Sequence, residues 1–275
     1  MNCKASLLAM TTCFFGVIAI GQAAFAAEDL GAAATNPVSN LIQFRLQDQF
    51  TASSHNVNGN SNAAIVQVVA PIPALASKFD SLKGIVTRVT TAAYVTTPDF
   101  DVRGRENGLG DTSVLVFAVP EAAPEKTVWG IGPAITIPTA SNDYTGAGQW
   151  SLGPAAVVMV SPKKGLQVGM LAFQQWDVAD TRSDAADVSQ LSLQPILTKH
   201  FDKGWYVALP DSPQVYDFET SEWTLNLGGV LGRVFPVAGR PMQIYGGVYY
   251  NPNNDSGAIA PEWTVKMQLG WLFPQ

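Results

Sequence analysis

Few side chains in this sequence could catalyse a reaction, and they are widely spaced. The 275 residues include two histidines, His55 and His200. A nucleophilic serine needs a histidine base and an orienting group within hydrogen-bond reach. Ser53 and Ser54 precede His55, but they lie in a stretch rich in Ser and Asn, which is typical of a solvated loop. We therefore assign no catalytic residues and predict that the protein is not an enzyme.

Metal and cofactor sites are equally poorly supported by the sequence. Carboxylates cluster in two places, and clusters of this kind bind Ca²⁺ in some proteins. Neither spacing matches an EF-hand, so we interpret both as solvated surface. The Gly108-Leu109-Gly110 stretch is too short for a phosphate-binding loop. We assign no metal and no cofactor. The clusters are Asp99, Asp101 and Glu106, and Asp177, Asp180, Asp184 and Asp187.

The N-terminal residues 1–26 have the three parts of a secretory signal peptide. Lys4 provides the positive start, residues 5–20 are apolar, and Ala24-Phe25-Ala26 forms a small-residue cleavage site. An uncleaved transmembrane helix is the alternative, because the apolar span approaches the roughly 20 residues that a bilayer requires. Cleavage after Ala26 would remove both cysteines, and with them any disulfide, thiolate metal site or cysteine nucleophile.

The remaining composition narrows the class of protein. Beyond residue 26 the chain has 15 Lys and Arg against 22 Asp and Glu, a balance that argues against nucleic-acid binding. Charged residues make up only 14% of the chain, well below the usual quarter or so. No later segment approaches 18 consecutive apolar residues, which excludes membrane-spanning helices there. A soluble β-sandwich and an outer-membrane β-barrel remain.

Alternation of apolar and polar residues at both ends of the chain favours the barrel. Near the C-terminus the residues from Trp263 to Phe273 place apolar and aromatic side chains on one face and mostly polar or small ones on the other. Residues 39–50 alternate in the same way. A strand that crosses a membrane in a barrel needs an apolar lipid-facing side, a polar inner side and aromatic residues at both interfaces.

The pattern predicts about twelve strands in one closed antiparallel transmembrane β-barrel, an all-β fold spanning residues 39–275. Residues 27–38 fit no strand and are expected to form a leader or a plug. Long polar loops mostly alternate with short links, as expected for extracellular loops and periplasmic turns. Three prolines, Pro133, Pro154 and Pro195, fall inside predicted strands, where we expect bulges. The predicted strands are 39–50, 63–71, 84–97, 109–120, 127–139, 148–160, 165–177, 188–200, 204–218, 222–234, 241–250 and 261–273.

Closure of this barrel would pair the first and last strands, near Phe44 and Met267, and turn several polar side chains inward. Such groups must be solvated or hydrogen-bonded, so they line water or form a plug. The three cations among them would give the interior a positive field that favours anionic solutes. These candidate lumen-lining residues are Gln43, Arg45, Gln47, Arg88, Lys266 and Gln268.

An ordered series of short motifs resembles an outer-membrane family named for the meta-pathway of phenol degradation. The resemblance covers roughly residues 108–275, and the earlier residues match only in general character. It implies an outer-membrane barrel that passes small organic compounds, and it brings no catalytic residues. The motifs are Gly108-Leu109-Gly110-Asp111, Trp129-Gly130-Ile131-Gly132-Pro133, Ile137-Pro138-Thr139-Ala140, Leu152-Gly153-Pro154-Ala155, Gln194-Pro195, Gly204-Trp205-Tyr206, the residues from Gly228 to Phe235, and Leu272-Phe273-Pro274.

Three functions follow as hypotheses. The first is a channel or diffusion facilitator for small hydrophobic or aromatic solutes in the outer membrane of a Gram-negative bacterium. Its partners would be outer-membrane lipid, those solutes and the barrel-assembly machinery during insertion. The second is a structural or surface-binding barrel without transport. The third is a lipid-modifying barrel enzyme, which lacks a convincing catalytic triad.

Overall fold

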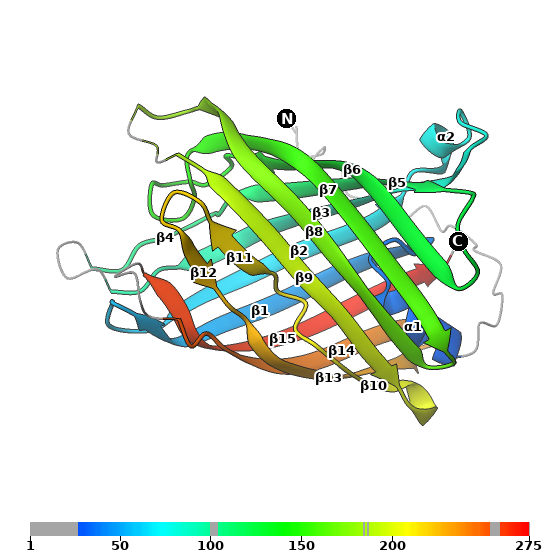
Figure 1. Ribbon diagram of the computed structural model, residues 1–275. Helices are drawn as coiled ribbons and strands as arrows, with labels where there is room; N and C mark the ends of the chain where they lie inside the picture. Colours follow the sequence, from blue (N-terminus) through cyan, green and yellow to red (C-terminus); the bar gives the residue numbers. More distant parts are fainter. Residues whose placement is uncertain (1–26, 100–103, 184, 186, 254–258, 275) are drawn as a thin grey trace, which may run out of the picture.

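The chain forms one closed antiparallel β-barrel. The computed structural model describes residues 27–99, 104–183, 185, 187–253 and 259–274, so the predicted signal peptide, residues 1–26, lies outside the described part. Twelve strand positions form the barrel wall, and the sheet closes because the first strand pairs with the last (Figure 1). The predicted fold class is therefore confirmed.

Most of the wall consists of long, continuous strands, two positions are divided, and β4 extends the sheet beside β3. Strands β10 and β11 share the ninth position, and β12 and β13 the tenth. The strands are β1 (Leu41–His55), β2 (Ser61–Pro71), β3 (Leu82–Thr96), β4 (Asn107–Gly108), β5 (Thr112–Pro120), β6 (Thr127–Ile137), β7 (Gln149–Lys163), β8 (Leu166–Asp180), β9 (Ser189–His200), β10 (Trp205–Ala208), β11 (Gln214–Asp217), β12 (Glu222–Thr224), β13 (Leu227–Val237), β14 (Arg240–Tyr250) and β15 (Ala260–Pro274).

Two α-helices and one 3₁₀ turn accompany the strands. Helix α1 (Ala27–Thr35) lies at the end of the barrel where β15 finishes, and α2 (Pro73–Ala76) lies at the same end, within the long link between β2 and β3 (Figure 1). The turn η1 (Asp202–Gly204) joins β9 to β10. Among the described residues, no helix is both long and apolar enough to cross a bilayer.

The first and last strands pair along almost their whole length, as predicted. Their register differs from the expected one: Phe44 lies opposite Trp271, and Met267 lies opposite Asp48. The ring centroids of Phe44 and Trp271 are 5.8 Å apart, and the ring planes are tilted by 46°. The register at closure depends on the stagger accumulated around the whole barrel, which neither strand encodes alone.

Strand β15 shows how the alternating sequence sorts side chains between lipid and interior. Val265, Met267 and Leu269 are exposed on the outer face, whereas Lys266 and Gln268 are buried on the inner face. Apolar residues outside and polar residues inside are what a barrel in a membrane requires.

Strands in the middle of the chain alternate less clearly because both of their faces are apolar. In β7, Val158 is exposed on the outer face while Val157 and Met159 are buried inside. These inner side chains belong to an apolar cluster that also contains Phe117 and Leu171. This part of the interior is therefore a packed apolar core.

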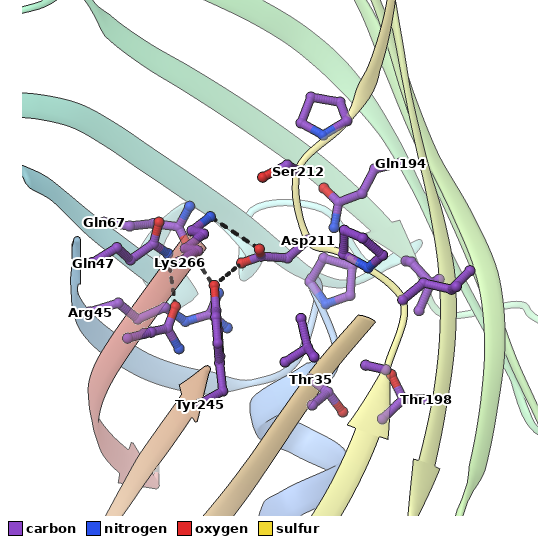
Figure 2. Close-up of a pocket in the computed structure, with 18 of the residues that line it drawn as sticks. Thr35, Arg45, Gln47, Gln67, Gln194, Thr198, Asp211, Ser212, Tyr245 and Lys266 are labelled. Atoms are coloured by element: carbon purple, nitrogen blue, oxygen red, sulfur yellow. Dashed lines mark hydrogen bonds and ion pairs between the residues drawn. The ribbon is translucent and has the colours of Figure 1, made fainter. Parts of the chain in front are cut away.

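Strand nine is interrupted, and the prediction of a continuous strand over residues 204–218 is wrong. Residues 209–213 leave the wall between β10 and β11 and run through the interior (Figure 2). Pro210 and Pro213 lie in this segment, and proline has no N–H to donate to a sheet. We call residues 209–213 the strap.

The tenth strand is divided opposite the strap, so the predicted strand 222–234 is also not continuous. Asn226 lies between β12 and β13, and its backbone N–H donates to Oε1 of Gln214 (2.6 Å). The Gln214 side chain donates in return to the Asn226 carbonyl oxygen (3.2 Å). Side-chain hydrogen bonds thus replace part of the missing backbone ladder.

The expected bulges are absent at Pro133 and Pro154, whereas beside Pro195 the pairing of β9 shifts by one residue between its contacts with β10 and with β11. Pro133 lies opposite Pro154 in the pairing of β6 with β7, and the register is unchanged on either side of each proline. Pro195 lies on β9 beside the strap. Leu197, two residues along, accepts a hydrogen bond from the Leu209 N–H, so the backbone of Pro195 also faces the strap. Its missing N–H is tolerated because strand nine leaves the wall there.

The facing of Leu269 leads to a test of the fold in the membrane. Leu269→Arg should impair assembly, because an arginine on the lipid face near the bilayer midplane costs roughly 2–4 kcal/mol. Leu269→Met, which keeps the face apolar, is the matched control. Heat-modifiable migration of the two variants after folding into lipid vesicles gives the comparison. Equal folding yields would mean that this face does not contact lipid.

Candidate functional site

The strap is fixed to the opposite part of the barrel wall by the carboxylate of Asp211. Its Oδ2 accepts a hydrogen bond from the Tyr245 hydroxyl (2.6 Å), and its Oδ1 accepts one from the Tyr249 hydroxyl (3.2 Å). Lys266 Nζ lies 3.0 Å from the same Oδ1 and forms a salt bridge. Figure 2 shows Asp211 pointing away from the strap toward Lys266 and Tyr245. Three donors from β14 and β15 therefore hold this one side chain.

Burial makes the contact between Asp211 and Lys266 important. The Lys266 side chain is 6% exposed and that of Asp211 is 27% exposed. A buried ammonium without a counter-charge is strongly unfavourable. Each charge is thus tolerated because the other is present, and the strap stays inside the barrel.

A chain of glutamine side chains continues the polar network along the inner wall. Gln47 donates to Gln268 (2.8 Å), Gln268 donates to Gln243 (2.8 Å), and Gln243 donates to the hydroxyl of Tyr206 (2.9 Å). These groups come from β1, β15, β14 and β10. An amide both donates and accepts, so a row of amides can satisfy itself without introducing charge.

Helix α1 docks against the same wall through its last carbonyl groups. The final carbonyls of a helix have no partner within the helix. Here Gln167 Nε2 donates to the Ala32 oxygen (2.9 Å) and Arg45 Nη2 donates to the Ala34 oxygen (2.9 Å). A cation at this end also complements the helix dipole. Thr35 completes the contact by donating to Gln167 Oε1 (2.6 Å).

A cavity of about 310 Å³ lies between the strap, α1 and the inner wall. Arg45, Arg88 and Lys266 are the cations on its lining, and Asp211 is the carboxylate. Its other polar groups are mainly amides and hydroxyls. Its apolar lining includes Ile65 and Val69 from β2, Pro195, Ile196 and Leu197 from β9, and Leu209 and Pro210 from the strap.

A second cavity of about 380 Å³ lies on the other side of the N-terminal segment. Ala34, Thr35 and Pro37 border the first cavity, whereas Ala32, Ala33, Asn36, Val38 and Ser39 border the second. Residues 32–39 therefore separate an interior cavity from one near the barrel end.

The structure brings together most of the residues that the sequence singled out. Arg45, Gln47, Arg88, Lys266 and Gln268 all line the first cavity. Gln43 also points inward but is fully buried, and its Oε1 accepts a hydrogen bond from Arg45 Nε (3.1 Å). That these residues line a route for solutes stays a prediction.

Sequence reasoning missed the strap and its anchor Asp211. The available signal was the pair Pro210 and Pro213 flanking an acidic residue inside a predicted strand, a pattern that argues against a regular membrane-spanning strand. It also missed Tyr245 and Tyr249. Their hydroxyl groups point to Asp211, but in the sequence they look like ordinary aromatic residues of a strand.

The two histidines lie at opposite ends of the barrel. His55 ends β1, and its Nε2 lies 2.8 Å from the Asn251 carbonyl oxygen. His200 ends β9 near α1 and contacts Thr35 (3.2 Å) and Gln167 (3.2 Å). Within the described residues, no Ser–His hydrogen bond occurs at the rim that carries His55.

The acidic clusters do not form a metal site in the described part of the chain, where no group of three potential ligands is found. Asp101 and Asp184 lie outside that part. Asp177 has a local role, since its Oδ1 accepts a hydrogen bond from the Val188 N–H (3.0 Å).

A closed twelve-strand barrel with a lipid-facing apolar exterior and a partly polar interior is an outer-membrane type of fold. Residues 32–228 match the family described as "Putative MetA-pathway of phenol degradation". This match covers most of the sequence, and the chain belongs to that family. The resemblance inferred from the motifs is thereby confirmed.

A similar solved structure supports the same architecture. An outer-membrane channel from Pseudomonas putida F1 is similar at a TM-score of 0.60 and 14% identity, covering 85% of this chain and 94% of that one. Outer-membrane phospholipase A from Escherichia coli is more distant, with a TM-score of 0.45 and 10% identity over 90% of this chain and 97% of that one. No curated protein sequence matches significantly.

The salt bridge of the strap can be measured with a double-mutant cycle. Asp211→Asn should lower the free energy of unfolding by about 1–3 kcal/mol, because Lys266 is left buried without its counter-charge. Adding Lys266→Gln should recover part of that loss. The urea midpoint of the folded barrel in detergent is the quantity to compare.

Asp143→Asn serves as the control for this cycle. Asp143 pairs with Arg182 at the rim, and its side chain is 64% exposed, so its removal should cost less than about 1 kcal/mol. If Asp211→Asn is as mild as Asp143→Asn, the carboxylate of Asp211 does not fix the strap.

Proposed function

We propose that this protein is an outer-membrane channel or diffusion facilitator for small hydrophobic or aromatic compounds. The observation that carries the proposal is the cavity of about 310 Å³ inside a closed barrel, between the strap and α1. This volume is at the lower end of the roughly 300–1,000 Å³ of ligand pockets, and it suits a compound with a single ring. The similar outer-membrane channel of P. putida adds support from the fold alone.

The position of the cavity favours solutes with an apolar body. Leu209 and Leu197 line it, and each is also about two-fifths exposed. The cavity therefore extends to the gap in the barrel wall between β10 and β11. A ring could contact these side chains and the prolines of the strap while the amides opposite bind its polar substituents.

Residues 27–38 act as a plug in this proposal, and the part of this segment next to the first cavity is its floor. Residues 32–39 separate the two cavities, so a solute that passes along the axis has to displace them. The helix is short and is held mainly by side-chain hydrogen bonds from Arg45 and Gln167. Such contacts can open without unfolding the barrel.

The location and partners follow from the same proposal. Export through a signal peptide cleaved after Ala26 would bring the chain to the outer membrane of a Gram-negative bacterium, where the barrel-assembly machinery would insert it. Its exposed apolar face, with Phe44, Leu46 and Met267, suits contact with membrane lipid.

A structural barrel without transport is the second candidate. The observation in its favour is the packed apolar cluster inside the barrel, in which Phe117 and Leu171 are fully buried. This candidate predicts that α1 never leaves its site and that no solute crosses.

Uptake by intact cells separates the two candidates. Gram-negative cells that produce the protein should take up radiolabelled benzamide several-fold faster than cells with an empty vector, because their lipopolysaccharide layer retards apolar solutes. Stachyose, a solute much larger than the cavity, is the control and should show no difference. Equal benzamide uptake in both cell types would leave the structural barrel as the better account.

The plug leads to a second transport prediction. Gln167→Ala removes hydrogen bonds to Ala32 and Thr35, so α1 should dissociate more often and the swelling rate of proteoliposomes in arabinose should rise several-fold. His55→Ala, at the other end of the barrel, should leave that rate unchanged. A rate that is the same for Gln167→Ala and the wild type would show that α1 does not limit passage.

A further inference from the structure

The charges on the cavity lining do not balance. Three cations, Arg45, Arg88 and Lys266, face one carboxylate, Asp211, so the lining has a formal charge of +2. Asp211 is already engaged by Lys266 and two tyrosine hydroxyls. Arg45 donates only to neutral oxygen atoms, on Gln43, Gln67 and Ala34. No second carboxylate is among the described residues that line this cavity, so the remaining two charges are not neutralised there.

Arg88 differs from the other two cations. Within the described residues its guanidinium forms no hydrogen bond and no salt bridge. It is partly accessible although it points into the barrel, so the surface it exposes faces the cavity. Arg45 lies close enough to repel it, and Asp211 close enough to attract it. A guanidinium in a confined site needs water or an anion to compensate its charge.

Apolar side chains lie next to Arg88. It lies opposite Val69 in the pairing of β2 with β3, and Ile65 is further along β2 on the same inner face. The planar guanidinium fork matches a carboxylate and can bind both of its oxygens. A ligand with a carboxylate on a small apolar body would satisfy the charge and the apolar lining together.

We propose that Arg88 is the binding residue for the carboxylate of small aromatic acids in this cavity. This inference rests on the proposed function and specifies its substrate class. Arg45 contributes to the positive field without releasing α1, and Ile65 and Val69 contact the ring. Lys266 has no part in binding, because Asp211 neutralises it.

Three isosteric probes that differ in charge test the proposal. Benzoate, benzamide and benzamidinium have nearly the same shape and carry charges of −1, 0 and +1. Isothermal titration of the folded barrel in detergent, at low chloride, should show benzoate binding at least tenfold more tightly than benzamide. Benzamidinium should not bind detectably. Acetate should bind more weakly than benzoate, because it lacks the ring.

Variants of Arg88 identify the residue responsible. Arg88→Gln should abolish the preference for benzoate over benzamide, and Arg88→Lys should retain part of it. Arg240→Gln, at an exposed arginine that begins β14, is the control and should bind benzoate like the wild type. Heat-modifiable migration verifies that each variant is folded.

Several outcomes would overturn the proposal. These are equal affinity of the wild type for benzoate and benzamide, an unchanged preference in folded Arg88→Gln, or acetate binding as tight as that of benzoate. Because binding is measured without a membrane, the result is independent of transport. Uptake of benzamide without a preference for benzoate would refute this inference alone. Binding of benzoate without any uptake would refute the proposed channel alone.

Discussion

Backbone hydrogen bonding within the membrane is the constraint on which the rest of this structure depends. A lipid environment offers no partners for N–H and C=O groups, so a sheet that crosses it has to close on itself. Pairing of β1 with β15 achieves this closure. At the strap the backbone pairing between neighbouring strands is interrupted. Pro210 and Pro213 remove two donors, and Gln214 and Asn226 supply side-chain hydrogen bonds instead.

The arrangement of the interior follows from the interruption of the barrel wall at the strap. A segment that leaves the wall has to be held inside, and Asp211 provides the attachment by binding Lys266, Tyr245 and Tyr249. The strap and α1 then border the cavity of about 310 Å³, and residues 32–39 separate it from the second cavity. Since Asp211 neutralises Lys266 alone, Arg45 and Arg88 keep the interior positive although the chain as a whole is acidic.

Much of this architecture could be predicted from the sequence, since lipid on one side and polar groups on the other impose a strict alternation. The residues from Trp263 to Phe273 show that pattern clearly, and their inner neighbours Lys266 and Gln268 lie on the cavity as expected. The pattern weakens in β7, where Val157 faces a packed core and Val158 faces lipid. Alternation of apolar and polar residues cannot show which face of a strand contacts lipid when the other face contacts an apolar core.

The strap, by contrast, could not be predicted from periodicity. Its position depends on contacts between residues more than 30 positions apart, such as Asp211 with Tyr245, and these become visible only when the barrel is assembled. The register of closure was missed for the same reason. The position of Pro195 on β9 now has a physical explanation, because the neighbouring strand is interrupted beside it.

The central feature of the proposed function is an interior cavity that receives small aromatic compounds. Anomalous diffraction from crystals soaked in 4-bromobenzamide tests this claim most directly, because bromine marks the position of the ring. We expect a bromine peak inside the barrel, between Ile65 and Pro210. A peak confined to the lipid-facing surface, with none inside the barrel, would contradict it.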